Sequence, residues 1–349
     1  MARRKCGAQT LVFHSAPKIM SAATVVGPLE GEGPLGTCFD VVYPDQLAGH
    51  KSWEACERAM MKEAVSLALS KGGLTAEQVD FLLAGDLLNQ IISCNFAARD
   101  LGIPFLGLYG ACSSFAESLG LAASLVDAGF ATHTLAAVSS HYGTSERQYR
   151  FPTEYGGQRP PHSQYTVTGS GAALVTSAAQ AGKTQAVTHF TIGRVLDLGI
   201  KDPYEMGAAM APAAADTLQR HLLDTGRTPT DYDLILTGDL ASVGRNIMLE
   251  LMDLAGIDIH ANYDDCGCRI FDREQQPVFA GGSGCACAAV VTLGSVLKQM
   301  HDNDLQRVLV IATGALLSPL TYQQGETIPG VAHAIVLEQI EGGAQTGNG

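Results

Sequence analysis

Short apolar runs recur along the chain and divide it into two similar halves. The β-rich run DFLLAGDL at 80–87 reappears as DLILTGDL at 233–240, and each copy follows a helix-start signal, LTAEQ or RTPTD. The strand-like GSGAALVTS at 169–177 likewise matches GVAHAIVLE at 330–338. The spacing between copies varies while their order is kept, which indicates a duplicated domain with loop insertions.

The longest apolar segments with helical spacing are also repeated. Residues 110–140 align with residues 284–314, and the Leu-Gly pairs at 119–120 and 293–294 fix the register. Each half therefore predicts a strand, a long Ala-rich helix, a strand, a loop and a strand, in a mixed sheet covered on both faces. We predict an α/β fold of five layers, α-β-α-β-α, with the repeated helices at the centre. We assign the halves to 1–182 and 183–349.

Composition and charge exclude several functional classes. The chain is 46% hydrophobic and 16% charged, which supports a large core. The formal charge of −13 opposes attraction to nucleic acid or anionic lipid, so we expect no nucleic-acid partner. No apolar region of the signal-peptide type follows MARRKC, and no apolar stretch approaches ~18 residues. We therefore expect a soluble chain that could still dock on a membrane protein.

The nine cysteines are an odd number without an oxidising context, so free thiols are expected. The pairs CGC at 266–268 and CAC at 285–287 have single-residue spacers and no histidine at finger spacing, so we expect buried packing thiols there. The sequence predicts neither a metal site nor a cofactor.

One long loop, at 143–167, has no counterpart in the second half. It contains three arginines, three tyrosines and three prolines, a composition unlike the rest of this acidic chain. We interpret it as a candidate lid or partner surface, and an ordinary surface excursion remains the alternative. If it folds over a cleft, Arg150 and Arg159 could pair with the carboxylates of a ligand; otherwise both are surface residues.

The duplicated halves, the cysteine in YGACSSFAE (109–117) and the Gly-x-Gly-Ala strand start at 169–172 together resemble the thiolase and ketoacyl-synthase superfamily over nearly the whole chain. In that superfamily a cysteine in the position of Cys112 is the acyl-accepting nucleophile, and the helix start lowers its pKa. The resemblance also implies a histidine and an asparagine in the second half. By position these fall on Gly238 and near Gly282, and losing even one such donor typically costs ~10² to 10³ in rate. We therefore expect no carbon–carbon bond formation.

What remains is a crevice that favours a small anion. Its glycines would let a ligand approach backbone N–H groups, and its two helix N-termini would each favour negative charge by ~0.3 to 1 kcal/mol. The candidate ligand-binding residues are Ala111, Cys112, Ser113, Ser114, Gly238, Asp239, Gly281, Gly282, Ser283, Arg150 and Arg159. Other roles remain open, because Cys112 could be a packing thiol, the serines could cap the helix, and Asp239, which repeats as Asp86, could form a turn.

Within the superfamily, the segments VFHSAPKI (12–19), RFPTEYGGQRPPHSQYTVTGSGA (150–172) and GRVLDLGIKDPYEMGAAMAPAA (193–214) resemble the stage V sporulation AD family of spore-forming bacteria. That resemblance implies a non-catalytic protein that binds dipicolinate (pyridine-2,6-dicarboxylate), with or without calcium. It implies a peripheral place on the inner spore membrane with other stage V sporulation A membrane proteins, in dipicolinate uptake during sporulation and release in germination. The superfamily also implies a homodimer joined at the sheet edges of the first halves.

Two alternatives to a binding protein stay open at this point. One is an acyl-transfer or thioester-hydrolysing enzyme with Cys112 as nucleophile. The other is a structural scaffold with a vestigial cleft.

Overall fold

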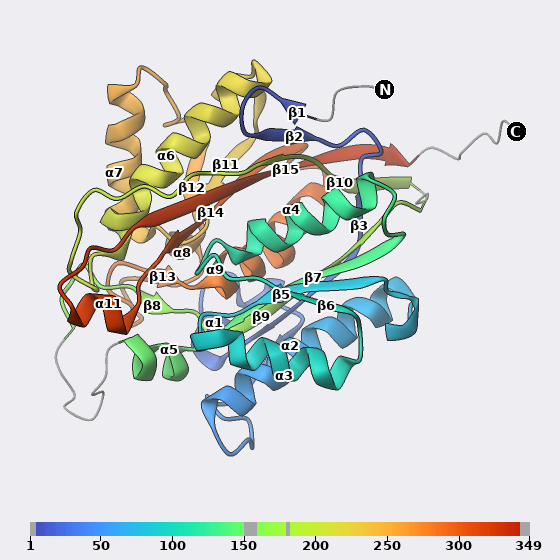
Figure 1. Ribbon diagram of the computed structural model, residues 1–349, viewed down its shortest axis with the longest axis horizontal. Helices are drawn as coiled ribbons and strands as arrows, with labels where there is room; N and C mark the ends of the chain where they lie inside the picture. The colour runs from blue at the N-terminus through green and yellow to red at the C-terminus, as the bar shows by residue number, and fades with distance from the viewer. Residues whose placement is uncertain (1–4, 150–158, 179–181, 343–349) are drawn as a thin grey trace, which may run out of the picture.

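Two five-stranded sheets stack with helices between them and on both outer faces (Figure 1). The structure is a computed structural model that describes residues 5–149, 159–178 and 182–342. The sheets follow the strand orders β3-β9-β7-β5-β6 and β10-β15-β14-β11-β12, and they meet where Lys18 of β3 pairs with Ala186 of β10. The orders are the same when the strands of each half are matched in sequence, as the duplication predicts.

The main elements of the first half are β3 (Lys18–Val26), α2 (Trp53–Gly72), β5 (Phe81–Gly85), α3 (Ile92–Leu101), β6 (Phe105–Gly107), α4 (Ser114–Asp127), β7 (His133–Ser140) and β9 (Gly169–Thr176). Those of the second half are β10 (Gly182–Thr191), α6 (Met206–Thr225), β11 (Leu234–Thr237), α7 (Ala241–Leu254), β12 (Tyr263–Asp265), α9 (Cys285–Val290), β14 (Arg307–Ala315) and β15 (Gly330–Gly342). The short elements are β1 (Lys5–Cys6), β2 (Thr10–Val12), α1 (Pro28–Gly31), β4 (Val41–Val42), α5 (Tyr142–Tyr149), β8 (Tyr165–Thr166), α8 (Cys266–Arg269), β13 (Gly282–Ser283), α10 (Leu297–His301) and α11 (Pro319–Gln323).

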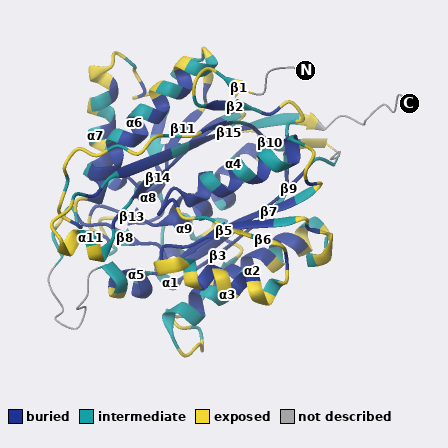
Figure 2. Cartoon of the chain, viewed as in Figure 1, coloured by how far each residue is buried: buried dark blue, intermediate teal, exposed yellow. Residues whose placement is uncertain are grey.

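The five layers follow from three separate apolar clusters. One fills the space between the sheets around α4 and α9, one lies under α6 and α7, and one lies under α2 and α3. The central helices are buried almost all round, whereas the outer helices expose one face (Figure 2). The predicted five-layer fold of two duplicated halves is therefore confirmed, while the boundary at 182/183 stays a prediction.

Small residues let the central helices lie close to the sheets. A Cβ at Gly120 of α4 would lie 2.4 Å from the ring of Phe190 on β10, so only glycine leaves room for that ring. The residues Cys285 to Ala289 of α9 are all small and all buried. The nine cysteines are free thiols, and six of them are buried, among them Cys266, Cys285 and Cys287 of the CGC and CAC pairs.

Two local predictions were wrong. The helix-start signals LTAEQ and RTPTD do not begin α-helices: they form single 3₁₀ turns, Ala76–Gln78 and Pro229–Asp231, each closed by a capping box. The 143–167 segment is only partly a loop, because its first seven residues belong to α5 and two later ones form β8. Strand β8 pairs with β13 in parallel, joining the first half to the second beside the candidate site.

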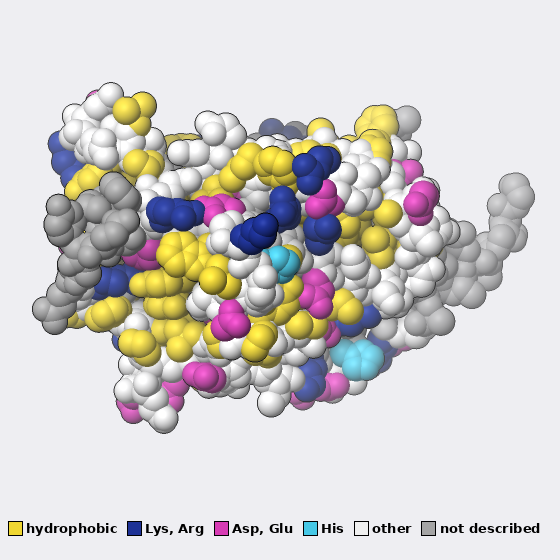
Figure 3. All heavy atoms as spheres, turned by 90° about the horizontal axis from the view of Figure 1, so that it is seen from below, with side chains coloured by type: hydrophobic (Ala, Val, Ile, Leu, Met, Phe, Trp, Pro, Cys, Tyr) yellow, Lys and Arg dark blue, Asp and Glu magenta, His cyan; other side chains and the backbone are white. Residues whose placement is uncertain are grey.

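The lower face of the molecule, formed by α2, α3 and α5, carries apolar and basic side chains side by side (Figure 3). Phe96 of α3 is 38% exposed, and the guanidinium groups of Arg58 and Arg99 lie 5.6 and 4.7 Å from its ring centroid. Strand β6 forms the outer edge of the first-half sheet, with Leu106 48% exposed. No helix in the described part of the chain is long and apolar enough to cross a membrane.

Candidate ligand-binding site

Cys112 lies in a tight turn directly before α4. The turn requires a positive φ of 50° at Ala111, a left-handed conformation that costs energy for any residue with a Cβ. The hydroxyl of Ser113 donates to the carbonyl of Gly110 at 2.6 Å, and that of Ser114 donates to the carbonyl of Ala111 at 2.8 Å. Both serines are fully buried. Their hydroxyls therefore hold the turn together and do not cap the free N–H groups of the helix.

The residue that meets the thiol from the second half is Asp239, which follows β11. Its carboxylate accepts the S–H of Cys112, the N–H of Gly284 at 3.0 Å and the hydroxyl of Thr313. A Cβ at Gly238 would instead point at Ala288 and β14, with Ala288 Cβ 3.1 Å away. Asp239 is thus a partner of the cysteine, whereas its repeat in the first half accepts backbone N–H groups at the start of α3.

Burial sets the charge state of this pair. Removal from water, followed by the nearby charge of Asp239, raises the pKa of the Cys112 thiol well above its usual range. Burial also raises the pKa of Asp239 to about 7, although its three hydrogen bonds work in the opposite direction. At neutral pH the sulfur is therefore a protonated thiol. The helix start does not produce the thiolate that the superfamily resemblance implies.

The remaining glycines of the crevice allow close packing of backbone. A Cβ at Gly282 would lie 2.9 Å from Ile270, and Gly281 has a φ of +130°, which side-chain-bearing residues rarely adopt. Ser283 is the member of this strand whose side chain reaches the space beside the thiol. The Cβ positions of Gly281 and Gly282 therefore face packed neighbours such as Gly267 and Ile270 rather than open space.

A small cavity lies beside Cys112. It encloses about 30 Å³, room for about one water molecule. Its walls are formed by Leu87, Ala111, Cys112, Ser145, Tyr149, Thr166, Met206, Ser283, Ala315 and Leu317. The hydroxyl oxygen of Ser145 is fully buried and has no hydrogen-bond partner. Because buried donors are normally hydrogen-bonded, this hydroxyl indicates that a polar ligand atom or a water molecule binds in the cavity.

The comparisons with known proteins identify the family. The model of the stage V sporulation protein AD family matches residues 7–338. This chain belongs to that family. It is 52% identical over 336 residues to stage V sporulation protein AD of Bacillus subtilis strain 168, covering 96% of this chain and 98% of the relative.

Solved structures support the fold of this stage V sporulation AD family member. The 3-oxoacyl-[acyl-carrier-protein] synthase III of Aquifex aeolicus superposes with a TM-score of 0.56 at 15% identity, covering 92% of this chain and 99% of that one. OleA of Xanthomonas campestris superposes with a TM-score of 0.60 at 13% identity, covering 93% and 99%. At such identities the likeness shows a thiolase-like fold and nothing about the reaction.

In this family member, no histidine of the described residues lines the cavity. His141 lies at the end of β7, and both of its ring nitrogens are occupied: Nδ1 accepts the N–H of Gly143, and Nε2 lies 2.8 Å from the carbonyl oxygen of Gln46. Burial lowers the pKa of His141 to about 4, which keeps the ring neutral. The nearest proton acceptor to the thiol is therefore a carboxylate.

The two candidate arginines do not form a basic lid over the cavity. Arg150 lies outside the described residues. Arg159 is turned inward with 11% of its side chain exposed, at 3.4 Å from the carboxylate of Glu146, and its guanidinium stacks near Tyr142 and Phe279. Its side chain is therefore largely buried, unlike that of a surface residue, and it does not line the cavity; its contact with a ligand stays a prediction.

Sequence reasoning missed seven residues of the cavity wall, among them Leu87 after β5 and Ala315 at the end of β14. Ser145 and Tyr149 come from α5, Thr166 from β8, Met206 from the start of α6, and Leu317 from the segment after β14. The hydroxyl of Tyr149 donates to the carbonyl of Leu87 and lies 3.3 Å from that of Tyr109.

Proposed function

We propose that this protein binds dipicolinate as a non-catalytic component of a transport assembly at the inner spore membrane. In that role it would work with the other stage V sporulation A membrane proteins, in uptake during sporulation and release in germination, with calcium as an accompanying ion. Membership of the stage V sporulation AD family supports a role in sporulation. The ligand and the assembly are the parts that need testing.

The proposal rests on two groups that line the same cavity: a hydroxyl without a hydrogen-bond partner and a cysteine whose thiol stays protonated. Ser145 offers a free hydroxyl, and Cys112, which lines the same cavity, is held protonated by burial and by Asp239. A carboxylate group needs hydrogen-bond donors, and a hydroxyl supplies one without a chemical step. A thiol with a raised pKa is a poor nucleophile, because the thiolate is the reactive form.

The cavity must open for such a ligand to enter. A planar aromatic dicarboxylate is several times larger than the water-sized space beside Cys112. Leu317 borders both this space and an outer groove of about 300 Å³ that is lined by Leu88, Asn89, Gln90, Ile91, Tyr109, Leu316, Leu317 and Ser318. Tyr149 borders the cavity, and its hydroxyl lies 3.3 Å from that of Tyr109, which lines the groove. We propose that rotation of the Tyr149 ring opens a path between the two spaces.

Calorimetric titration with dipicolinate tests the proposal. We expect Ser145→Ala to weaken binding about 10- to 100-fold, because hydrogen bonds to charged groups contribute about 1.5–3 kcal/mol. The matched control is Ser66→Ala at an exposed position of α2, which should leave the affinity unchanged. Absence of binding to the unaltered protein, or equal affinity in Ser145→Ala, would refute this site.

The enzymatic alternative has its own measurement. If Cys112 accepted acyl groups, incubation with acyl-coenzyme A would add the acyl mass to the intact protein, and Cys112→Ala would abolish the addition. We expect no addition at neutral pH. An adduct that depends on Cys112 would replace the binding role by an acyl-transfer role.

We also propose that the protein forms a homodimer through β6. This strand is at the edge of its sheet, so one side of its backbone is unpaired within the sheet, and its Leu106 is exposed. Exposed strand edges pair readily with another chain. A second copy related by a two-fold axis would continue the sheet and cover Leu106.

A further inference from the structure

We propose that His162, Asp202 and Glu205 form a binding site for a divalent transition-metal ion such as Zn²⁺, Co²⁺ or Mn²⁺. This inference does not depend on dipicolinate binding. The sequence predicts no metal site from its cysteine pairs, and these three residues are separated along the chain with no recognised spacing. The fold brings them together.

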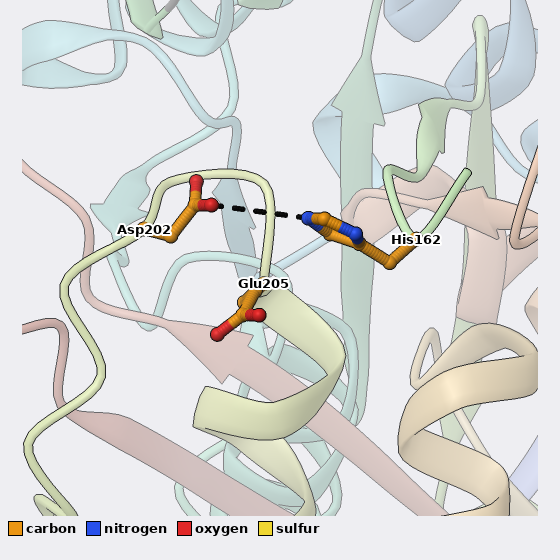
Figure 4. A group of neighbouring side chains, drawn as sticks. All are labelled: His162, Asp202 and Glu205. Atoms are coloured by element: carbon orange, nitrogen blue, oxygen red, sulfur yellow. Dashed lines mark ion pairs between the residues drawn. The ribbon is translucent and has the colours of Figure 1, made fainter. Parts of the chain in front are cut away.

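The three side chains come from two separate segments of the chain. His162 follows the prolines at 160 and 161, Asp202 lies in the turn before α6, and Glu205 is the residue at which α6 begins. One ligand atom from each lies within 4.8 Å of the other two. Figure 4 shows Asp202 facing the imidazole, with Glu205 at the helix start beside them.

The imidazole nitrogen that faces this group has no other role. Nε2 of His162 is buried and has no hydrogen-bond partner, and it lies 3.8 Å from Oδ2 of Asp202, too far for a hydrogen bond. The other oxygen of Asp202 already accepts the N–H of Tyr204 at 2.8 Å, which orients the carboxylate with Oδ2 toward the ring. Buried polar atoms are normally satisfied, so an unsatisfied one facing a carboxylate indicates a missing partner of positive charge.

The distances fit an ion after small side-chain rotations. Zinc binds imidazole nitrogen and carboxylate oxygen at about 2.0–2.2 Å, which separates neighbouring ligand atoms by about 3.4 Å at tetrahedral angles. Asp202 and Glu205 are both exposed, so each carboxylate can move inward by about the required ångström without disturbing the core. The net charge of −13 also favours cations over anions near this surface.

The donor set selects the class of metal. One imidazole with two carboxylates suits zinc and the neighbouring transition ions, whereas calcium prefers oxygen ligands alone. Three protein ligands leave at least one coordination position for water or another ligand. A bound ion would link His162 of the first half to α6 of the second, next to Met206 in the wall of the cavity.

Cobalt titration of the reduced protein, in buffer without dipicolinate, tests the site. We expect one Co²⁺ per chain with the weak visible bands of nitrogen and oxygen ligands, and no intense thiolate-to-cobalt band. His162→Ala should weaken the binding at least tenfold, and Asp202→Asn should weaken it as well. The control is His260→Ala, which removes an exposed imidazole lying 3.1 Å from Asp253.

The outcomes separate the proposal from its competitors. Equal binding in His162→Ala and the unaltered protein would overturn it, and so would a strong thiolate band, which would assign the ion to cysteines. Absence of binding would overturn it too. A rise in unfolding temperature with Zn²⁺ that is lost in His162→Ala would show that the ion also stabilises the junction between the halves.

Discussion

Replacement of Asp239 by asparagine provides the sharpest check on the chemistry beside Cys112. Asparagine keeps the size of the side chain and removes its ability to take up a proton. Burial raises the pKa of Asp239 from 3.8 to about 7, so the folded protein holds a proton there that the unfolded chain releases above about pH 4. The stability from this proton is fully present below about pH 4 and is lost as the pH rises through about 7.

The magnitude follows from the two pKa values. Between pH 5 and pH 8 only the two pH units up to the folded-state pKa of about 7 contribute, and at 1.36 kcal/mol per unit they remove about 3 kcal/mol from the free energy of unfolding. Between pH 5 and pH 8 the free energy of unfolding of Asp239→Asn should therefore fall by about 3 kcal/mol less than that of the unaltered protein. Any hydrogen bond that asparagine fails to replace, to Gly284 or Thr313, costs about 1–3 kcal/mol at every pH and so cancels in the comparison.

The assay is denaturant unfolding at pH 5 and pH 8 of the unaltered protein, Asp239→Asn and an exposed control, Asp304→Asn. Other buried carboxyl groups with a raised pKa, such as Glu30 at about 7, contribute equally to all three proteins. If Asp239→Asn and Asp304→Asn show the same pH dependence as the unaltered protein, Asp239 is ionised in the fold at both pH values. The account of a carboxyl group that burial keeps protonated at pH 5 would then be wrong.

Three further predictions test other parts of the structure. Cys112 should react with iodoacetamide far more slowly than the partly exposed Cys38 in the native protein at pH 8, as followed by mass spectrometry; equal rates would contradict its burial and raised pKa. Gly120→Ala should lower the free energy of unfolding by about 1–3 kcal/mol, because its Cβ would overlap the ring of Phe190 although alanine favours helices; a stabilised variant would refute this packing. Leu106→Lys should convert a dimer into a monomer in light scattering, and an unchanged mass would exclude β6 as the interface.

Much of the fold could be predicted because it depends on local patterns that occur twice. The runs at 80–87 and 233–240 contain β5 and β11, and the aligned segments at 110–140 and 284–314 contain α4 and α9. Apolar periodicity and the order of the copies were enough to predict two sheets with helices between them. The 3₁₀ turns at 76–78 and 229–231 were mistaken for helix starts, since a capping box closes a single turn as well as it begins a helix.

The site was predicted only where one short segment determines it. Cys112 and Ser283 lie in the cavity wall as expected, but Ser145, Tyr149 and Met206 reach it only through the packing of α5 and α6 against the turn at 110–113. The contact between Cys112 and Asp239 joins residues from different halves, and no pattern along the chain indicates which of Gly238 and Asp239 faces the sulfur.

The dependence on contacts between distant segments also explains why the sequence suggested a lowered pKa for the Cys112 thiol, whereas the structure gives a raised one. A helix start next to a cysteine favours a thiolate by an amount of the order of 0.3–1 kcal/mol at exposed sites, and this is visible in the sequence. Burial without a compensating cation raises a thiol pKa by a larger amount, and burial depends on the whole fold. At Cys112 the helix start and burial act in opposite directions on the thiol pKa. Burial, which the sequence does not reveal, has the larger effect. A superfamily nucleophile motif is therefore evidence for the turn and the fold, whereas reactivity has to be decided from the groups that surround the sulfur.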